Sequence, residues 1–406
     1  MPNYVKESVQ FARSLQFWRM AVLWTYNIFY SYFLQFVGKF RRQRTPSFPH
    51  SSHLSSSGAV PICVITGVSK RLVIFAHVIF LARCFLTVEL SVKHRRLLLA
   101  WAEQLLVLFP RKDSTSFSLH GVPDAASRSS EALTKTMAEI RKQNPNARLK
   151  SFVLDTSSVT SIVLFKESLE RWLLDSNIDC SIQLLINNAG ILTTSSRKTD
   201  KDYDQMMFTN YIGPFFLTKL LMPLLTRSPS GSRIVNVTSF THRSLFGIQM
   251  DKESLTGTKY NEVKNYPYAY IYEFSKLCVL LFTYQLHREL NRDDNARFKV
   301  SVIAADPGVV RTKIMREFPA FVSALAYSVL GFLCLLQQPS QGVSAILDAA
   351  FAPSDASGLY FFGGKGRILS SSRLSNDNNL SRKLWEISST LFSDFVLDQF
   401  VDGKTY

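Results

Sequence analysis

Short apolar runs alternate with longer amphipathic stretches through most of the chain after residue 148. Apolar runs that end in a turn are typical of buried strands, and apolar positions repeating every three to four residues are typical of helices. Strands are predicted at 60–66, 149–154, 182–186, 233–238, 299–304 and 359–362. Helices are predicted at 159–174, 203–226 (bent near Pro214), 268–291 and 340–351. This alternation predicts an α/β fold, a Rossmann-like doubly wound parallel sheet covered on both faces.

Polar or turn-forming residues follow several of the predicted strands. They are Asp155, Asn187, Ser239 and the pair Pro307-Gly308. In open parallel sheets, ligands bind at the carboxyl ends of the strands. We therefore expect these residues to converge at one edge of the sheet.

Tyr272 and Lys276 lie one turn apart on a predicted helix and share a face. A neighbouring ammonium group favours a phenolate, which otherwise needs a pH near ~10. Such a tyrosine can exchange a proton with an alcohol or a carbonyl at neutral pH. The Ser239 hydroxyl could hold the same substrate oxygen, so the three residues are the proton half of a hydride-transfer site.

A second Tyr-x-x-x-Lys pair, Tyr260 and Lys264, lies in a polar stretch between Gly257 and Pro267. A long helix is not expected there. We therefore assign the site to the pair at Tyr272 and interpret the first pair as a surface loop.

Taken in order, these motifs resemble those of the short-chain dehydrogenase/reductase family over roughly 60–67 and 127–365. The segments around Ser239 and Tyr272 are similar to the retinol-dehydrogenase-like branch, which includes the X-linked dehydrogenase/reductase member. The matching positions are Asn-Asn-Ala-Gly at 187–190, Asn210, Ser239, Tyr272, Lys276, and Pro-Gly-x-x-x-Thr at Pro307, Gly308 and Thr312.

The resemblance implies a role for each matching residue. Tyr272 would be the general acid/base, Lys276 would support it and hold the nicotinamide ribose, Ser239 would orient the substrate oxygen, and Asn210 would hold a helix bend and a relay water. The implied cofactor-binding residues are Thr66, Gly67, Arg128, Asp155, Asn188, Ala189, Gly190, Tyr272, Lys276, Pro307, Gly308 and Thr312. Arg128 would face an adenosine 2′-phosphate, which implies NADP rather than NAD. Taken singly, Asn187 and Gly190 could be turn residues, Pro307-Gly308 a loop breaker and Asp155 a helix cap.

The cofactor loop departs from the family pattern. The family has Thr-Gly-x-x-x-Gly-x-Gly after the first strand, where glycines let the backbone approach the pyrophosphate. Here the sequence from Thr66 to Val73 is TGVSKRLV, and only Gly67 remains. The stretch 68–126 is an atypical insertion or replacement that disrupts the second βα unit. It could be a divergence that abolishes cofactor binding, an insertion that still allows the sheet to assemble, or a gene-model error. We favour the error, because the damage is local.

Two apolar runs without charges suggest a lipid environment. The run 20–38 is rich in aromatic residues, is long enough for a short membrane span, and precedes a basic cluster at 39–44. An in-plane amphipathic anchor is the alternative. The run 318–336 is interpreted as a substrate-covering helix pair that dips into lipid, with a true span as the alternative. Under either interpretation this second run favours an apolar substrate such as a retinoid, sterol, polyprenol or fatty aldehyde.

The 406 residues therefore divide into an anchor (1–45), a linker (46–59), the catalytic domain (60–365) and a tail (366–406). With 46% hydrophobic and 19% charged residues the chain is not disordered, and its net charge of +16 suits an anionic membrane or a phosphate-bearing cofactor. No nucleic-acid motif, metal site or disulfide framework is predicted, and the sequence is compatible with a homodimer. The predicted membrane is the endoplasmic reticulum, with the catalytic domain facing the cytoplasm.

The predicted function is an NADP-dependent oxidoreductase acting on a lipophilic alcohol, aldehyde or ketone. The alternative is a catalytically impaired family member that acts as a binding or scaffold protein, because the glycine-rich loop is lost.

Overall fold

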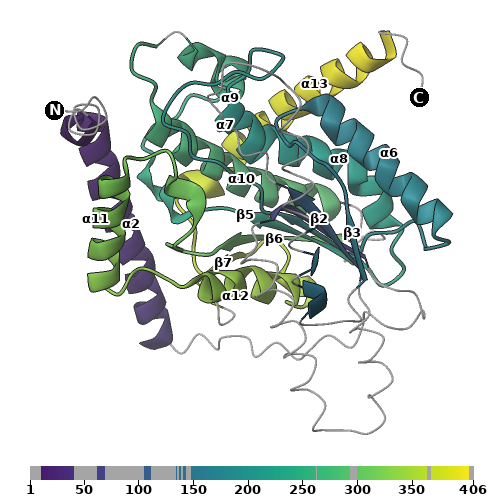
Figure 1. The fold of residues 1–406 in the computed structure, drawn as a ribbon, viewed down its shortest axis with the longest axis horizontal. Coiled ribbons are helices and arrows are strands. Elements are labelled where there is room, and N and C mark those ends of the chain that lie inside the picture. The colour runs from purple at the N-terminus through teal and green to yellow at the C-terminus, as the bar shows by residue number, and fades with distance from the viewer. Residues whose placement is uncertain are drawn as a thin grey trace, which may run out of the picture.

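A computed structural model shows one seven-stranded parallel sheet with helices on both faces (Figure 1). It describes residues 11–40, 62–68, 105–110, 148–261, 263–292, 300–363 and 367–401, with a few positions between 134 and 142. The strands are β1 (Ile62–Val68), β2 (Leu105–Pro110), β3 (Arg148–Ser151), β4 (Leu184–Asn187), β5 (Ser232–Val237), β6 (Val300–Asp306) and β7 (Tyr360–Phe362). Their order across the sheet is β3-β2-β1-β4-β5-β6-β7, which confirms the predicted doubly wound architecture.

The helices of the described residues surround the sheet, with α6, α8 and α10 over one face and α12 over the other. They are α2 (Leu15–Phe40), α6 (Val159–Asp175), α7 (Gln205–Met207), α8 (Gly213–Thr226), α9 (Lys252–Thr256), α10 (Tyr268–Leu290), α11 (Ala320–Phe332), α12 (Pro339–Ala350) and α13 (Asn378–Val401). Alternate residues of a strand face opposite layers. In β1, Val64 therefore joins the core beneath α6, α8 and α10, whereas Ile65 joins the core beneath α12.

Strand β2 lies within the stretch 68–126, which was predicted to be an atypical insertion or replacement. Its backbone pairs in parallel with β1, Ile62 opposite Leu105, and with β3, Leu105 opposite Arg148. A strand is therefore present within the stretch 68–126 that was interpreted as an insertion or replacement, as the alternative of an insertion that still allows the sheet to assemble requires. Residues 69–104 lie outside the described residues. A short apolar run inside a longer apolar stretch gives no periodicity by which a strand can be recognised.

Helix α13 occupies most of the stretch that was assigned to a tail. Leu384, Leu391 and Phe395 are buried in the same core as α8 and α10. The Trp385 ring stacks on Phe282 of α10 with 6.3 Å between ring centroids. Apolar residues spaced three, four and seven apart are the signal that could have revealed this helix.

Helix α2 contains the run that was predicted to span a membrane. Among the helices of the described residues, none is long and apolar enough for such a span. Polar side chains of α2, including Asn27, Ser31 and Gln35, are buried against the protein body. The run 318–336 likewise contains α11, which is only 13 residues long. The predicted span of residues 20–38 is therefore not supported.

Candidate active site

The end of β5 and the middle of α10 bring the predicted catalytic residues together. Lys276 Nζ donates a hydrogen bond to the carbonyl oxygen of Val237, the last residue of β5, at 3.1 Å. In return, Thr238 Oγ1 donates to the backbone carbonyl of Lys276 at 2.9 Å. Ser239 follows directly, so the serine and the lysine are fixed to one another through the strand end.

Tyr272 and Lys276 share one face of α10, as predicted. Lys276 Nζ lies 5.8 Å from the centroid of the Tyr272 ring. Both residues are buried within a helix whose middle is almost entirely enclosed. The other candidate pair lies elsewhere, since Tyr260 ends a short 3-10 turn, Thr258–Tyr260. Of the two pairs, the one at Tyr272 is therefore the one that lies beside the end of β5.

Asn210 occupies a π-helical turn, Phe208–Ile212, between α7 and α8. Its Oδ1 accepts a hydrogen bond from the backbone N–H of Ile191 at 2.7 Å. Its Nδ2 donates to the Ile191 carbonyl and to Ser275 Oγ, each at 3.0 Å. Turns of this type are frequent at functional sites. The bend expected at this asparagine is present, and it joins the loop after β4 to α10.

The Asn-Asn-Ala-Gly turn after β4 is tied to the end of β1. Backbone N–H groups of Asn188 and Ala189 both donate to Thr66 Oγ1 at 3.1 Å. The Asn188 side chain donates to the Gly67 carbonyl oxygen at 2.8 Å. These bonds place the expected cofactor residues of two strand ends side by side.

Asn187 has a different environment from its neighbours. Its side chain donates to Asn236 Oδ1 and to Thr218 Oγ1, at 2.9 and 3.0 Å, within the protein interior. It is a structural link between β4, β5 and α8. Asn187 is therefore more than the ordinary turn residue considered as its alternative role, because its side chain joins two strands and a helix.

Gly190 brings this turn next to the catalytic residues. A Cβ atom at Gly190 would lie 3.4 Å from Lys276 Nζ and 3.5 Å from Asn210 Oδ1. Both distances are those of ordinary van der Waals contact, so this turn lies against Lys276 and Asn210. The end of β1, the turn after β4 and Lys276 are therefore adjacent at the carboxyl edge of the sheet, where open parallel sheets bind dinucleotides.

The remaining expected cofactor residues lie at other strand ends. Asp155 follows β3, and its Oδ1 accepts hydrogen bonds from Ser157 N–H and Oγ at 3.0 and 2.6 Å. These bonds resemble those of a residue that caps the start of the following helix. Gly308 has φ +73° and donates its N–H to Asp306 Oδ1 at 2.8 Å. Thr312 caps a short 3-10 turn. Arg128 and residues 69–104 lie outside the described residues.

Two residues near the site were missed by sequence reasoning. His242 is fully buried, its Nδ1 lies 2.6 Å from the Ser239 carbonyl oxygen, and its Nε2 accepts from Ser372 N–H at 3.1 Å. Because Nε2 accepts, Nδ1 carries the proton and donates to Ser239. Burial lowers the pKa of His242 to about 3, so the ring is neutral. Glu273, the second residue, is a lone acid in an apolar helix segment, and that pattern was the signal for a buried charge partner.

Comparison with known proteins establishes the class of this one. A family model described as short chain dehydrogenase matches residues 123–247. Polyprenol dehydrogenase of Danio rerio is 31% identical over 261 residues, covering 62% of this chain and 73% of the relative. Human retinol dehydrogenase 13 is 30% identical, covering 66% of this chain and 75% of the relative. The chain therefore belongs to the short-chain dehydrogenase/reductase family, in its retinol-dehydrogenase-like branch, and it is an oxidoreductase.

A solved structure agrees with this fold. An uncharacterized protein from Mycobacterium paratuberculosis aligns with a TM-score of 0.53 and 22% identity, over 86% of this chain and 97% of that protein. At this level of identity the similarity concerns the fold alone.

Proposed function

We propose that this protein is an NADP-dependent oxidoreductase that transfers hydride to or from a lipophilic alcohol, aldehyde or ketone. The observation that carries the proposal is the attachment of Lys276 to Val237 and Thr238 by two hydrogen bonds, directly before Ser239, with the Tyr272 ring 5.8 Å from Lys276 Nζ. The names of the relatives, polyprenol dehydrogenase and retinol dehydrogenase, support a lipophilic alcohol or carbonyl as substrate.

Each residue of the site has a separate task in the proposed reaction. The Tyr272 hydroxyl passes a proton to, or takes one from, the substrate oxygen, and the Ser239 hydroxyl holds that oxygen. The Lys276 ammonium supports the charge on Tyr272 as the proton moves. Asn210 fixes the loop after β4 against α10 through Ser275. The bound nicotinamide cofactor supplies or accepts the hydride.

The cofactor residues of the proposal lie at the end of, or follow, several strands of the sheet, namely β1, β3, β4 and β6. Thr66, Gly67 and the turn 188–190 would hold the cofactor from one side, with Asp155 at the adenine end. Pro307, Gly308 and Thr312 would contact the nicotinamide end. We assign the preference for NADP to Arg128. Arg128→Ala should then lower the ratio of kcat/KM for NADPH over NADH.

The central test is cofactor binding by the full chain. NADPH fluorescence should change on titration with the protein, and NADPH should be oxidised when a long-chain aldehyde or ketone is added in detergent micelles. Failure to bind millimolar NADPH would refute the proposal and favour the impaired scaffold protein.

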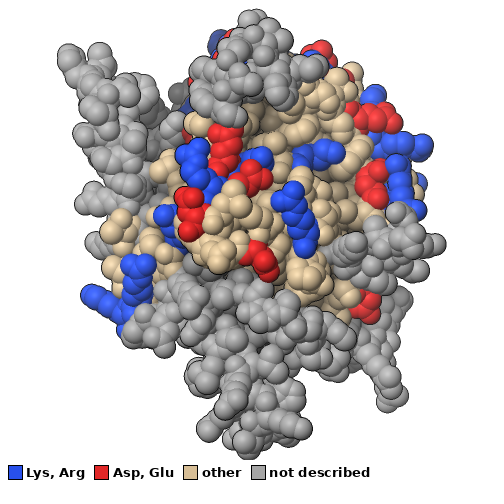
Figure 2. Space-filling view, turned by 90° about the vertical axis from the view of Figure 1, so that its right-hand side faces the viewer, with Lys and Arg blue, Asp and Glu red and all other residues tan. Residues whose placement is uncertain are grey.

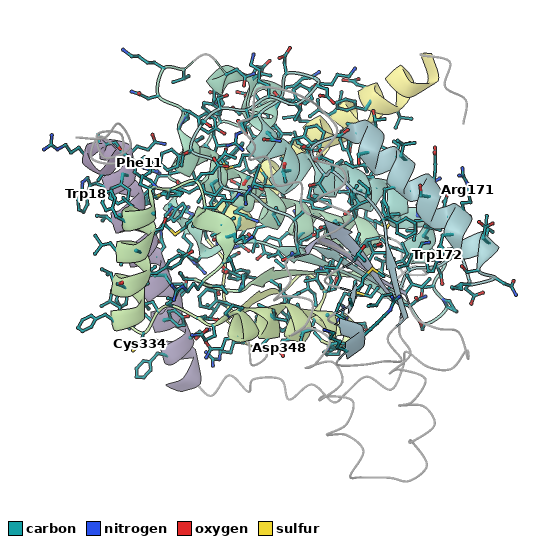
Figure 3. All side chains as sticks on the ribbon, in the orientation of Figure 1. Phe11, Trp18, Arg171, Trp172, Cys334 and Asp348 are labelled. Atoms are coloured by element: carbon teal, nitrogen blue, oxygen red, sulfur yellow. The ribbon has the colours of Figure 1, made fainter. Side chains whose placement is uncertain are left out.

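We also propose that the protein works at a membrane surface, which it contacts through an apolar face of α2. Helix α2 buries polar side chains and exposes apolar ones, the reverse of an ordinary surface helix. Its exposed side chains include Leu15, Trp18, Val22, Tyr26, Phe29, Phe33 and Phe36. Trp18 lies at the outer edge of the molecule (Figure 3).

Helix α11 extends this apolar surface. Its exposed side chains include Phe321, Leu325, Val329 and Phe332. The two helices lie along the same side of the molecule (Figure 1), and Gln337, shortly after α11, donates to the Tyr32 hydroxyl of α2 at 2.6 Å. The face over α6 differs, because Lys, Arg, Asp and Glu are interspersed there (Figure 2). In the sequence, the apolar residues of α2 are followed by the basic cluster at 39–44. Such a combination of aromatic, apolar and basic residues fits an anionic lipid surface.

Liposome sedimentation tests this part of the proposal. The wild-type chain should sediment with vesicles containing anionic lipid, and Trp18→Glu with Phe33→Glu should lose most of this binding. Leu174→Glu, at an exposed apolar position of α6, is the matched control and should still bind. A wild-type chain that stays in the supernatant would contradict the membrane role. The endoplasmic reticulum, with the site facing the cytoplasm, remains the proposed location.

A further inference from the structure

Glu273 is fully buried and directly follows the proposed catalytic residue Tyr272 in the sequence. A carboxylate in this position costs several kcal/mol unless it is paired and hydrogen-bonded. Burial raises the pKa of Glu273, and its partners Arg19 and Trp24 lower it. Those two partners come from α2, more than two hundred residues away in the sequence.

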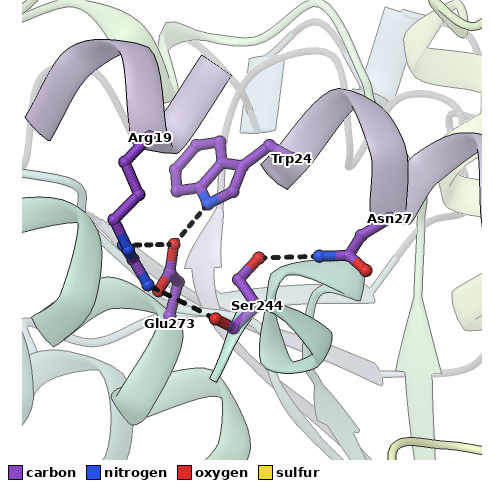
Figure 4. A network of polar contacts seen from close by, with 5 residues as sticks. All are labelled: Arg19, Trp24, Asn27, Ser244 and Glu273. Carbon is purple, nitrogen blue, oxygen red and sulfur yellow. Dashed lines mark hydrogen bonds and ion pairs between the residues drawn. The ribbon is translucent and has the colours of Figure 1, made fainter. Parts of the chain in front are cut away.

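The contacts form a compact network (Figure 4). Arg19 Nη2 lies 3.0 Å from Glu273 Oε2, and Trp24 Nε1 donates to Glu273 Oε1 at 2.7 Å. Arg19 Nη2 also donates to the carbonyl oxygen of Ser244, and Asn27 Nδ2 donates to Ser244 Oγ at 2.9 Å. Ser244 belongs to the 3-10 turn that begins directly after Ser239. Helix α2 is therefore hydrogen-bonded to α10, which carries Tyr272 and Lys276, and to the turn that follows Ser239.

Trp24 also contacts the catalytic tyrosine itself. The Trp24 and Tyr272 rings lie 5.7 Å apart between centroids, tilted by 44°. Aromatic pairs at this distance attract one another beyond their burial. The indole is thus fixed at its N–H by Glu273 and at its ring by Tyr272, which leaves it few alternative orientations.

We propose that Trp24 is a positioning residue of the active site, held in place by Glu273 and Arg19, and that α2 forms one wall of the substrate site. Trp24 limits the orientations of the Tyr272 ring and presents an apolar surface beside it to a lipophilic substrate. Small displacements of a reacting group lower rates steeply, so loosening this contact should act on kcat. The inference rests on the proposed function of Tyr272.

The competing explanation is that the network only fastens α2 to the protein body. A second set of hydrogen bonds between α2 and the protein body, at Gln35, allows a positioning role of Trp24 to be distinguished from attachment of the helix alone. Gln35 Nε2 donates to the Phe362 carbonyl at 3.0 Å, and Arg367 donates to Gln35 Oε1 at 2.7 Å. From Trp24 to Gln35 the helix advances by roughly 16 Å. Gln35→Ala should therefore loosen α2 without touching Tyr272.

The experiment compares Trp24→Ala, Trp24→Phe and Gln35→Ala in the full chain, with steady-state kinetics, NADPH affinity and thermal unfolding measured for each. Trp24→Ala should lower kcat at least ten-fold, with NADPH affinity within about two-fold of wild type. Trp24→Phe, which keeps a ring against Tyr272, should recover much of that loss. Gln35→Ala should lower the unfolding temperature yet leave kcat within about two-fold.

Two results would overturn the inference. Unchanged kcat in Trp24→Ala would exclude a positioning role, and equal kcat losses in Trp24→Ala and Gln35→Ala would show that fastening α2 explains everything. If the wild-type chain shows NADPH-dependent turnover and Trp24→Ala has the same kcat, only this inference fails. If the wild-type chain shows no NADPH-dependent turnover, the proposed function fails with it.

Discussion

The two halves of the site are built differently. In the proton-transfer half, two hydrogen bonds join Lys276 of α10 to Val237 and Thr238, the residues that precede Ser239. In the cofactor half, Thr66 and Gly67 are held by the turn after β4, and the sequence that follows them, Val68 to Val73, contains no glycine. The first half depends on side chains placed by regular elements, and the second depends on close backbone approach. Changes of single side chains should therefore separate the two halves.

The largest effect is expected at the proton-transfer half. Tyr272→Phe removes the hydroxyl that exchanges the proton and keeps the ring that contacts Trp24. General acid/base groups contribute about 10²–10⁴-fold to rates, so turnover should fall by at least a hundred-fold. NADPH affinity, measured by fluorescence titration, should stay within a few-fold. Turnover that survives in Tyr272→Phe would remove the tyrosine from the mechanism.

An intermediate effect is expected at the cofactor half, in Gly67→Ala. Gly67 has φ +67°, and a Cβ atom there would lie 2.3 Å from Ala189 Cα. The variant must push β1 away from the turn after β4, so it should lose stability and bind NADPH more weakly. Unfolding in urea measures the first loss and fluorescence titration the second.

Gly247 provides the matched control for this substitution. It has φ +61°, but a Cβ atom there would meet nothing within 4 Å. Gly247→Ala should therefore cost only about 1 kcal/mol of backbone strain. Equal losses of stability and of NADPH affinity in Gly67→Ala and Gly247→Ala would show that the close approach of Gly67 to Ala189 has no special importance.

The smallest effect concerns His242, which supports Ser239. Its pKa is about 3 in the folded protein and 6.5 in the unfolded chain. The unfolded chain therefore binds the extra proton below pH 6.5, and stability should fall as pH falls, by up to about 1.4 kcal/mol per pH unit. Urea unfolding between pH 7.5 and 5 measures this slope. His242→Gln should flatten it, and an identical slope in that variant would contradict the assignment.

The sequence predicted most of the sheet and the proton-transfer half, because motifs at strand ends identify parallel α/β folds and place their ligands. It did not predict β2, which is hidden within a long apolar stretch, or α13, which follows the last family motif. It also missed the pairing of Glu273 with Arg19 and Trp24. This pairing joins segments far apart in the sequence, and a single chain gives no pattern that matches one with the other.

The apolar run of α2 was similarly ambiguous. Its aromatic and aliphatic residues alone suggested a membrane span. In the structure the polar residues Asn27, Ser31 and Gln35 face the protein together with Met20 and Ile28, while most of the large apolar residues are exposed. The orientation of a helix whose apolar face is turned away from the core depends on tertiary contacts, and local periodicity does not reveal it.

The most direct test of the central claim is hydride transfer by the complete chain. The purified protein should oxidise NADPH deuterated at the nicotinamide C4 position in the presence of a long-chain aldehyde, and mass spectrometry should find the deuterium in the alcohol product. Tyr272→Phe should give almost none. A wild-type chain that yields no deuterated alcohol across aldehyde, ketone and the reverse alcohol reactions, and that leaves NADPH unbound at millimolar concentration, would contradict the account.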